Sequence, residues 1–441
     1  MDEHTLDVYL SMTEVIVMTS TVPEITIKRK IDMAINETQQ RIAKCEQSDK
    51  LRFNNNAFTR ERRLGAKNIL QLILHRIYRS LQLTLEKYFD EIGRTSVSKQ
   101  AFSQGRMLLN PEYVRTFADM TSRLAAEDQA LQSYNGMRLI AFDGSDVALE
   151  NTPELKETFG CSGPKKDAAT ALVSIAFGPL DQMIYDCRID QYDTDERTLA
   201  KAHVLRLMEL GLGGSLLLHD RWYPSAEYVA FLYETGFHFV MRVRSKFNLE
   251  ADAIKTQSWI RLKHEGKEYP VRVLKVTLNT GETETLFTSL DQKQLPLEKA
   301  GALYFERWKV ETAYDQLKSK LELENFSGKT KTSVLQDFYA TIYLANMIAF
   351  ADEEADKRIA ETDRDKELKY VRKANRSRSI FKFRDIFLRL IMEPDESKRT
   401  AMLDKLIEDI IRYPVPIVPD RSPIRKQPRK KRFYQTRRSV V

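Results

Sequence analysis

Four side chains of different chemistry fall on one stripe of a predicted helix. The segment YFERWKVETAYDQLKSKLELENF, from Tyr304 to Phe326, repeats apolar residues at intervals typical of an amphipathic helix. Because a helix advances about 100° per residue, a stripe about 60° wide holds four polar residues: Tyr304, Arg307, Glu311 and Lys318. The helix could therefore present a phenol, two cations and a carboxylate beside its apolar face. Arg307 and Glu311 also have the spacing of an ordinary ion pair on a solvated face.

Two aspartates end apolar runs that are typical of buried strands. MRLIAFD ends in Asp143, and GSLLLHD ends in Asp220. Ligands of open α/β sheets gather at the carboxyl ends of the strands, so these aspartates would meet if the two strands are neighbours. Glu311, on a helix packed against the same sheet, could add a third carboxylate. Each aspartate alone is also a common turn initiator, and Asp146 is a possible stand-in for Asp143.

Three carboxylates brought together would repel one another unless a cation neutralised them. Mg²⁺ or Mn²⁺ prefers oxygen ligands, and two such ions about 3.5–4 Å apart stabilise both oxygens of a phosphodiester displacement. The pattern therefore predicts two Mg²⁺ (or Mn²⁺) ions, and the predicted ligands are Asp143, Asp220 and Glu311. Arg307 and Lys318 would then hold phosphates, while Tyr304 would hydrogen-bond or stack nearby.

The elements that would position these residues follow one another from Met137 onward. Five apolar runs read as strands: MRLIAFD, ALVSIAF, QMIYDCRI, GSLLLHD and FHFVMRV. Helical patterns, ERTLAKAHVLRLMEL and PSAEYVAFLYETG, lie before and after the fourth run. This order predicts an α/β domain with an early meander and later helical crossovers. Asp193 and Asp195, in QYDTDERT, are interpreted as caps of the first of these helices.

The remaining segments flank or interrupt that core. Residues 246–298 alternate apolar and polar side chains around a turn signal at Asn279 to Gly281, which predicts an antiparallel strand insertion. The N-terminal pattern is helical, with Ser96 and Ser98 as possible caps, and fits either a DNA-binding or a packing module. The expected boundaries are 1–130 (helical), 131–245 (core), 246–298 (insertion), 299–350 (core, second part) and 351–441 (helical, with a basic tail).

Composition restricts the class of protein. The 441 residues carry a formal charge of +7, and the tail RSPIRKQPRKKRFYQTRRSVV contains no acidic residue, which favours a polyanionic partner. Three cysteines and six scattered histidines lack metal-ligand spacing, so no zinc site or disulfide framework is expected. The acidic start MDEHTLD and the absence of an apolar run near 18 residues predict a cytoplasmic protein without a membrane span.

These motifs resemble bacterial insertion-sequence transposases of the insertion-sequence-four type. The resemblance covers roughly Phe58 to Asn346, and the helical signature, with two, three and six intervening residues, is its most specific part. It implies an RNase H-like core with an Asp, Asp, Glu triad interrupted by a β-strand insertion. It also implies that water, assisted by two Mg²⁺ ions, cleaves the end of the element and that the freed 3′ hydroxyl attacks target DNA.

The resemblance further implies double-stranded DNA as partner and a homodimer that joins two element ends in the bacterial nucleoid. Tyr304 and Arg307 would contact the end's phosphate backbone, Lys318 would lie near the 5′ side of the cut, and Arg221 would add a DNA contact. Three tryptophans could stack a flipped base, although buried packing is the favoured role for each: Trp222, Trp259 and Trp308. A catalytically silent DNA-binding descendant and a nuclease without strand transfer remain open alternatives.

Overall fold

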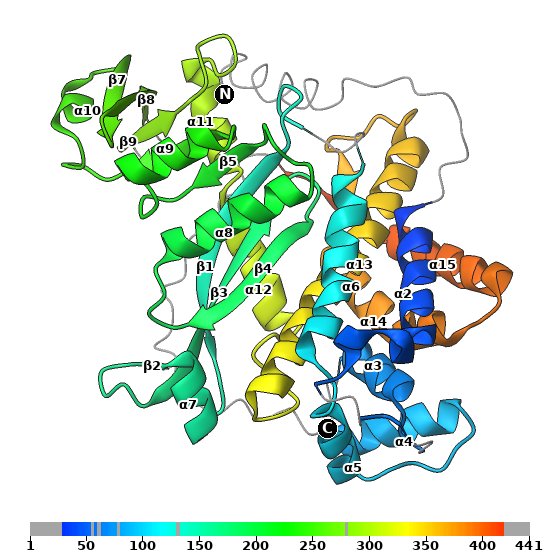
Figure 1. Cartoon of the computed structure of the whole chain (residues 1–441). Coiled ribbons are helices and arrows are strands. Elements are labelled where there is room, and N and C mark those ends of the chain that lie inside the picture. The colour runs from blue at the N-terminus through cyan, green and yellow to red at the C-terminus, as the bar shows by residue number, and fades with distance from the viewer. Residues whose placement is uncertain are drawn as a thin grey trace. The chain divides into compact units, whose positions relative to one another are not determined.

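The computed structural model describes residues 29–53, 57–59, 63–76, 80–128, 133–277 and 281–418 (Figure 1). The chain divides into two compact units, each assembled from separate stretches. The first contains Ala125–Asp146 and Ala171–Asp315, and the second contains Thr26–Leu124, Val147–Thr170 and Gln316–Val441. The basic tail and the predicted turn centre at Asn279 lie outside the described residues.

The first unit is a mixed α/β structure, as predicted. Its strands follow the order β4-β3-β1-β5-β6-β9-β8-β7. Their bounds are β1 (Leu139–Ala148), β3 (Ala168–Phe177), β4 (Ile184–Gln191), β5 (Leu216–His219), β6 (His238–Val243), β7 (Gln257–His264), β8 (Lys267–Thr277) and β9 (Thr283–Thr288). β3 and β4 pair antiparallel, whereas β5 pairs parallel with both β1 and β6. The early meander and the later parallel crossovers are therefore confirmed.

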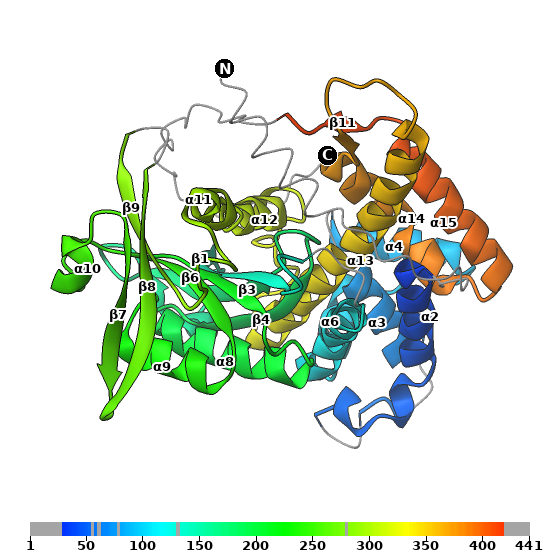
Figure 2. The same cartoon turned by 90° about the horizontal axis from the view of Figure 1, so that it is seen from above.

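Helices lie on both faces of this sheet (Figure 2). One face carries α8 (Glu196–Glu209) and α9 (Ala226–Glu234), and the other carries α11 (Leu297–Phe305) and α12 (Trp308–Ser319). Asp195 is the N-cap of α8, because its carboxylate accepts from the Arg197 N–H at 3.4 Å, as predicted. The short α10 (Leu249–Ala253) precedes the inserted strands.

The strand insertion is confirmed, and it extends the core sheet. β7, β8 and β9 form an antiparallel set, and β9 pairs antiparallel with β6, from Val240 opposite Thr288 to Val243 opposite Thr285. The inserted strands thus continue the hydrogen-bonded ladder of the core. Alternation along β7 places Ile260 and Leu262 in the interior and leaves Trp259, Arg261 and Lys263 exposed.

The expected single helix from Tyr304 to Phe326 is wrong. The chain turns tightly between α11 and α12, where the Arg307 N–H donates to the Tyr304 carbonyl three residues back at 3.1 Å. α12 ends at Ser319, and Glu322 then adopts a left-handed backbone with φ of 50°. Neither place contains the glycine or proline that normally marks a break, so the periodicity of apolar residues does not reveal them.

The second unit is helical around α13. Its described helices are α2 (Lys30–Ala43), α3 (Ala66–His75), α4 (Leu81–Glu91), α5 (Lys99–Arg106), α6 (Pro111–Ala126), α7 (Pro153–Phe159), α13 (Lys331–Asp363), α14 (Arg376–Met392) and α15 (Glu396–Ile411), with two short 3₁₀ turns, Cys45–Gln47 and Asp49–Leu51. Short β2 (Cys161–Ser162) pairs with β3, and β10 (Arg372–Lys373) pairs with β11 (Val415–Pro416). Ser98 caps α5, as predicted, because its hydroxyl accepts from the Ala101 N–H at 3.2 Å.

α13 is the core helix of the second unit. Thr330 caps it in a box with Ser333, and the helix then packs against α2, α3, α14 and α15. It is long and apolar enough to cross a membrane by composition, contrary to the expectation that no such run exists. However, 94% of its most apolar window is buried inside the protein, which is the behaviour of a core helix. The expected domain boundary at residue 350 falls within this continuous helix.

Asp337, on α13, forms a buried ionic network with two arginines. Its carboxylate oxygens lie 2.9 Å from Arg106 Nη2 and 3.3 Å from Arg76 Nη1. The Ser327 hydroxyl also donates to Asp337, at 2.7 Å, and Arg106 Nε donates to Gln336 at 2.8 Å. Burial alone would raise the pKa of Asp337, but the guanidiniums of Arg106 and Arg76 hold it below its usual value.

Candidate active site

Asp143 and Asp220 occupy equivalent places on neighbouring parallel strands. β1 pairs with β5 from Leu139 opposite Leu216 to Ala141 opposite Leu218, and each aspartate lies two residues beyond this last pair. The two strands are therefore neighbours, which is the condition on which the aspartates would meet. β1 does not end at Asp143, as the sequence suggested, but continues to Ala148. Asp146 accordingly lies within the strand, where it is exposed, and not in a loop.

Glu311 reaches the same site from the first turn of α12. Its carboxylate oxygen lies 3.0 Å from Arg307 Nη2, and its side chain is 41% exposed, whereas the Arg307 side chain is only 3% exposed. The predicted ion pair between these residues is confirmed. One turn further along the helix, the Tyr314 hydroxyl donates to the main-chain carbonyl of Asp143 at 2.9 Å. This contact joins the helix that carries Glu311 to the strand that carries Asp143.

The acids act on one another electrostatically. Burial raises the pKa of Asp143 to about 7; Arg307 opposes that shift, whereas Glu311, Glu196 and Asp220 add to it. Burial is the main cause of this shift, and the neighbouring acids add to it against the opposing charge of Arg307. The structure therefore brings the three predicted acids into one electrostatic neighbourhood.

Glu196 is a fourth acid, which the sequence reasoning missed. It stands in the first turn of α8, directly after the capping Asp195, and a Cβ added at Gly144 would lie 3.2 Å from Glu196 Cδ. Gly144, directly after Asp143, therefore leaves room for this side chain. Burial raises the pKa of Glu196, Tyr223 opposes the shift, and Asp220 adds to it. An acid in a first helical turn is ordinary, so nothing local marked Glu196 as part of the site.

The site matches a divalent cation in its donor chemistry. Carboxylate oxygens are the ligands that Mg²⁺ and Mn²⁺ prefer, and Glu311, Glu196 and Asp220 all act electrostatically on Asp143. Across the parts of the chain that the structure describes, no three acids, histidines or cysteines stand ready-made around a common metal position. Glu311 is instead engaged by Arg307.

The residues expected to contact DNA occupy different environments. Tyr304 is 4% exposed, and its hydroxyl donates to the His219 carbonyl at 3.2 Å, beside Asp220. Arg307 is equally buried, so in this structure both residues hold parts of the site and neither is presented on the surface. Lys318, on the last turn of α12, lies 3.9 Å from Glu324. Arg221 is exposed.

Two of the three tryptophans are exposed, so buried packing is the wrong interpretation for them. Trp222 is 55% exposed, and the Arg244 guanidinium lies 4.0 Å from the centre of its ring. Trp259 is 48% exposed on β7. Trp308 is half-buried, and Arg307 lies 5.0 Å from its ring centre. An exposed indole beside a guanidinium is a surface on which a base could stack.

A series of buried hydrogen bonds between a serine, a histidine and an aspartate supports the main chain at Asp143. His203 Nδ1 lies 2.8 Å from the Asp186 carboxylate, and His203 Nε2 lies 2.9 Å from the Ser174 hydroxyl. Ser174 Oγ is in turn 3.3 Å from the main-chain carbonyl of Asp143. Ser174 and His203 are at most 1% exposed, so this arrangement cannot serve as a nucleophile for an external substrate. It is a structural support that the scattered histidines of the sequence did not indicate.

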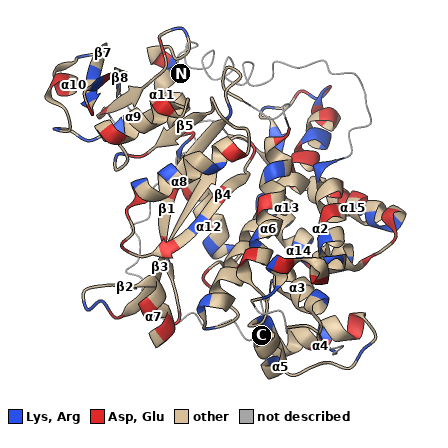
Figure 3. Ribbon diagram, in the orientation of Figure 1, with Lys and Arg blue, Asp and Glu red and all other residues tan. Residues whose placement is uncertain are grey.

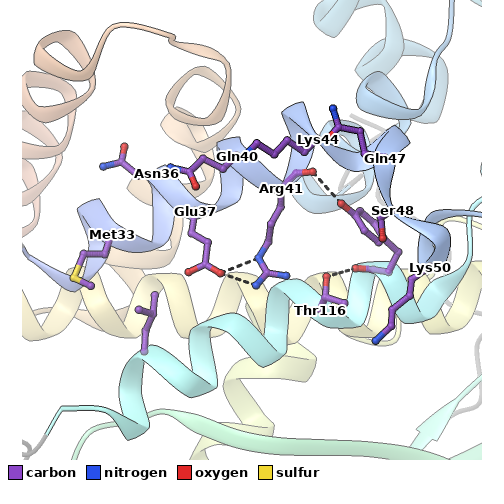
Figure 4. A pocket seen from close by; sticks show the side chains of 12 residues that line it. Met33, Asn36, Glu37, Gln40, Arg41, Lys44, Gln47, Ser48, Lys50 and Thr116 are labelled. Atoms are coloured by element: carbon purple, nitrogen blue, oxygen red, sulfur yellow. Dashed lines mark hydrogen bonds and ion pairs between the residues drawn. The ribbon is translucent and has the colours of Figure 1, made fainter.

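A surface groove of the second unit is unrelated to these acids. Residues of α2 and α6 line it, including Glu37, Arg41, Lys44 and Thr116 (Figure 4). Glu37 and Arg41 neutralise each other across 2.6 Å. More generally, α2 and α15 carry both signs of charge, so neither helix presents a purely basic face (Figure 3).

The segment that contains the three acids matches a known protein family. Residues 134–347, just under half of the chain, match the family model described as transposase DDE domain. This match supports a DDE transposase and includes Asp143, Asp220 and Glu311. The insertion-sequence-four type stays a prediction.

A comparison with solved structures found similarity to one titled as the cryo-EM structure of the piggyBac transposase synaptic complex with hairpin DNA. The two chains are 13% identical with a TM-score of 0.44, over 94% of this chain and 87% of that chain. A likeness of this size does not establish a shared fold. No curated protein matched.

Proposed function

We propose that this protein is a DNA transposase of the DDE class, with an RNase H-like core, that cleaves the ends of an insertion sequence and joins them to target DNA. The observation that carries the proposal is the convergence of Asp143, Asp220 and Glu311 in one electrostatic neighbourhood, where burial raises the pKa of Asp143 to about 7 and the other acids add to that shift. The transposase DDE match over residues 134–347 supports it independently.

Asp143, Asp220 and Glu311 would hold two Mg²⁺ (or Mn²⁺) ions, with Glu196 beside them. When bound, such ions lower the pKa of water and stabilise the oxygens of a phosphodiester displacement. The protein's own contribution is positional. Parallel pairing of β1 and β5 sets the spacing of the two aspartates, and α12 brings Glu311 to them. Arg307 balances the charge of Glu311 while no cation is present.

Double-stranded DNA is the proposed partner, and cations near the acids would hold its backbone. Arg221 follows Asp220 directly, and Lys318 lies two turns after Glu311 on α12, so both are placed to contact phosphates beside the scissile bond. Tyr304 and Arg307 would reach DNA only if the buried contacts described above rearranged. A homodimer would join two element ends, and the basic protein would act in the cytoplasm at the nucleoid.

The test is a cleavage and joining assay with labelled DNA that carries the element's ends. Glu311→Gln is expected to lower cleavage roughly a thousandfold or more while leaving end binding nearly intact, because the fold is kept and one ligand is lost. Glu306→Gln is the matched control, since this neighbouring acid pairs with Lys309 and not with the acid cluster. Normal cutting by Glu311→Gln would remove Glu311 from the site.

The same assay separates the alternative functions. Cleavage without joining of the 3′ hydroxyl to a second DNA would identify a nuclease. End binding without any cleavage would identify a catalytically silent descendant, an alternative favoured by the engagement of Glu311 with Arg307. Joined products that depend on Mg²⁺ would support the transposase.

A further inference from the structure

The helix that carries Glu311 is tied to the sheet by a tyrosine that the sequence analysis did not single out. Tyr314 is 5% exposed, and its hydroxyl lies 2.9 Å from the Asp143 carbonyl and 3.0 Å from the Val173 carbonyl. One hydroxyl proton is thus shared between β1 and β3. We propose that Tyr314 is a positioning residue that fixes Glu311 relative to Asp143, an inference that rests on the proposed function.

The helical geometry supports this role. Tyr314 follows Glu311 by three residues, so the two side chains lie on the same side of α12, about 4.5 Å apart along its axis. A contact that fixes Tyr314 against β1 therefore also limits the movement of Glu311 along and around the helix. The hydroxyl stays protonated and able to donate, because burial raises the pKa of Tyr314 well above its usual value.

Other contacts of the site do not perform this task. The Arg307–Glu311 ion pair links residues at either end of a single helical turn, so it cannot set a distance between helix and strand. Tyr304 ties α11 to the His219 carbonyl, beside Asp220, but the chain turns between α11 and α12. Ser174 approaches the Asp143 carbonyl from the sheet, at 3.3 Å. The Tyr314 hydroxyl, in contrast, joins the helix that carries Glu311 to the strand that carries Asp143.

The experiment is a calorimetric titration of the full-length, DNA-free protein with Mn²⁺. Tyr314→Phe keeps the buried ring and removes only the hydroxyl, so the variant is expected to fold. Its Mn²⁺ affinity should fall about tenfold, in the range seen when a group that orients metal ligands is lost. DNA cleavage at saturating Mn²⁺ should recover to within about threefold of the wild type, because the ligands themselves are intact.

A control variant separates positioning from general stability. Tyr343→Phe removes another buried tyrosine hydroxyl, which pairs with Thr38 at 2.7 Å in the second unit, and should leave Mn²⁺ affinity unchanged.

The possible results have distinct meanings. Wild-type Mn²⁺ affinity in Tyr314→Phe would overturn the positioning role, and so would equal losses in Tyr314→Phe and Tyr343→Phe. A wild-type protein that neither binds Mn²⁺ nor cleaves DNA would instead overturn the proposed function itself. A loss confined to Tyr314→Phe would support the inference.

Discussion

The acid cluster around Asp143 and the buried network around Asp337 show opposite electrostatic balances. Asp337 faces two guanidiniums, Arg76 and Arg106, and its pKa is lowered. Asp143 faces one guanidinium, Arg307, and several acids, and its pKa is raised to about 7. Both carboxyl groups are largely buried, so burial alone does not explain the difference. The compensating charges around each carboxyl group therefore decide the direction in which its pKa moves.

Removing the carboxylate of Asp337 tests whether its ion pairs stabilise the protein. This change should have the largest effect on stability. Asp337→Asn leaves two buried guanidiniums without their counter-charge, so the free energy of unfolding should fall by about 3–5 kcal/mol. Urea denaturation followed by circular dichroism measures it. Asp404→Asn is the matched control, because Asp404 also pairs with two arginines, Arg29 and Arg358, but is 42% exposed. Its loss should be at most about 1 kcal/mol, and an equal loss in both variants would contradict the comparison.

Removing the carboxylate of Asp143 should act in the opposite direction. Its folded-state pKa of about 7 exceeds the usual value of 3.8, so its stabilising contribution is complete below about pH 4 and is lost as the pH rises through 7. In EDTA at pH 8, Asp143→Asn should therefore raise the free energy of unfolding by roughly 1–3 kcal/mol. The gain should disappear at pH 4. A destabilised variant at pH 8 would show that the acids are already compensated.

The smallest effect is expected for Lys318, because this cation lies outside the buried network around Asp337. If Lys318 contacts a phosphate, Lys318→Ala should reduce the slope of log affinity against log salt by about 0.9 and weaken DNA-end binding only severalfold. Fluorescence anisotropy over a salt series measures both quantities. Lys398→Ala, an exposed lysine at the start of α15, is the control and should leave the slope unchanged. Identical slopes for Lys318→Ala and the wild type would exclude the phosphate contact.

The strand-borne part of the site could be predicted from the sequence. MRLIAFD and GSLLLHD are apolar runs with an aspartate at the same relative place, and parallel strands bring such places together. The inserted antiparallel strands were also predictable, because alternation of apolar and polar residues has only one regular interpretation. Both results depend on patterns that lie within one short segment.

The contacts between segments could not be predicted. The turn between α11 and α12 contains no breaker, so a continuous helix was expected where the chain turns at Arg307. Glu196 looks like an ordinary first-turn acid until the glycine at position 144 is seen to face it. In the sequence, Tyr314 looks like an ordinary residue of an amphipathic helix, although its hydroxyl joins α12 to β1. Each depends on a tertiary approach that no local pattern encodes.

The pairing of β9 with β6 also governs how the protein could be shortened. β6 is buried and apolar at Phe239, Val240 and Met241, and the inserted strands cover its outer edge. The outermost strand of the described sheet is β7, whose exposed Arg261 and Lys263 discourage further strand pairing. Excising residues 246–298 would expose the apolar edge of β6 and promote intermolecular β-aggregation. The insertion therefore contributes to solubility as well as to the architecture of the sheet.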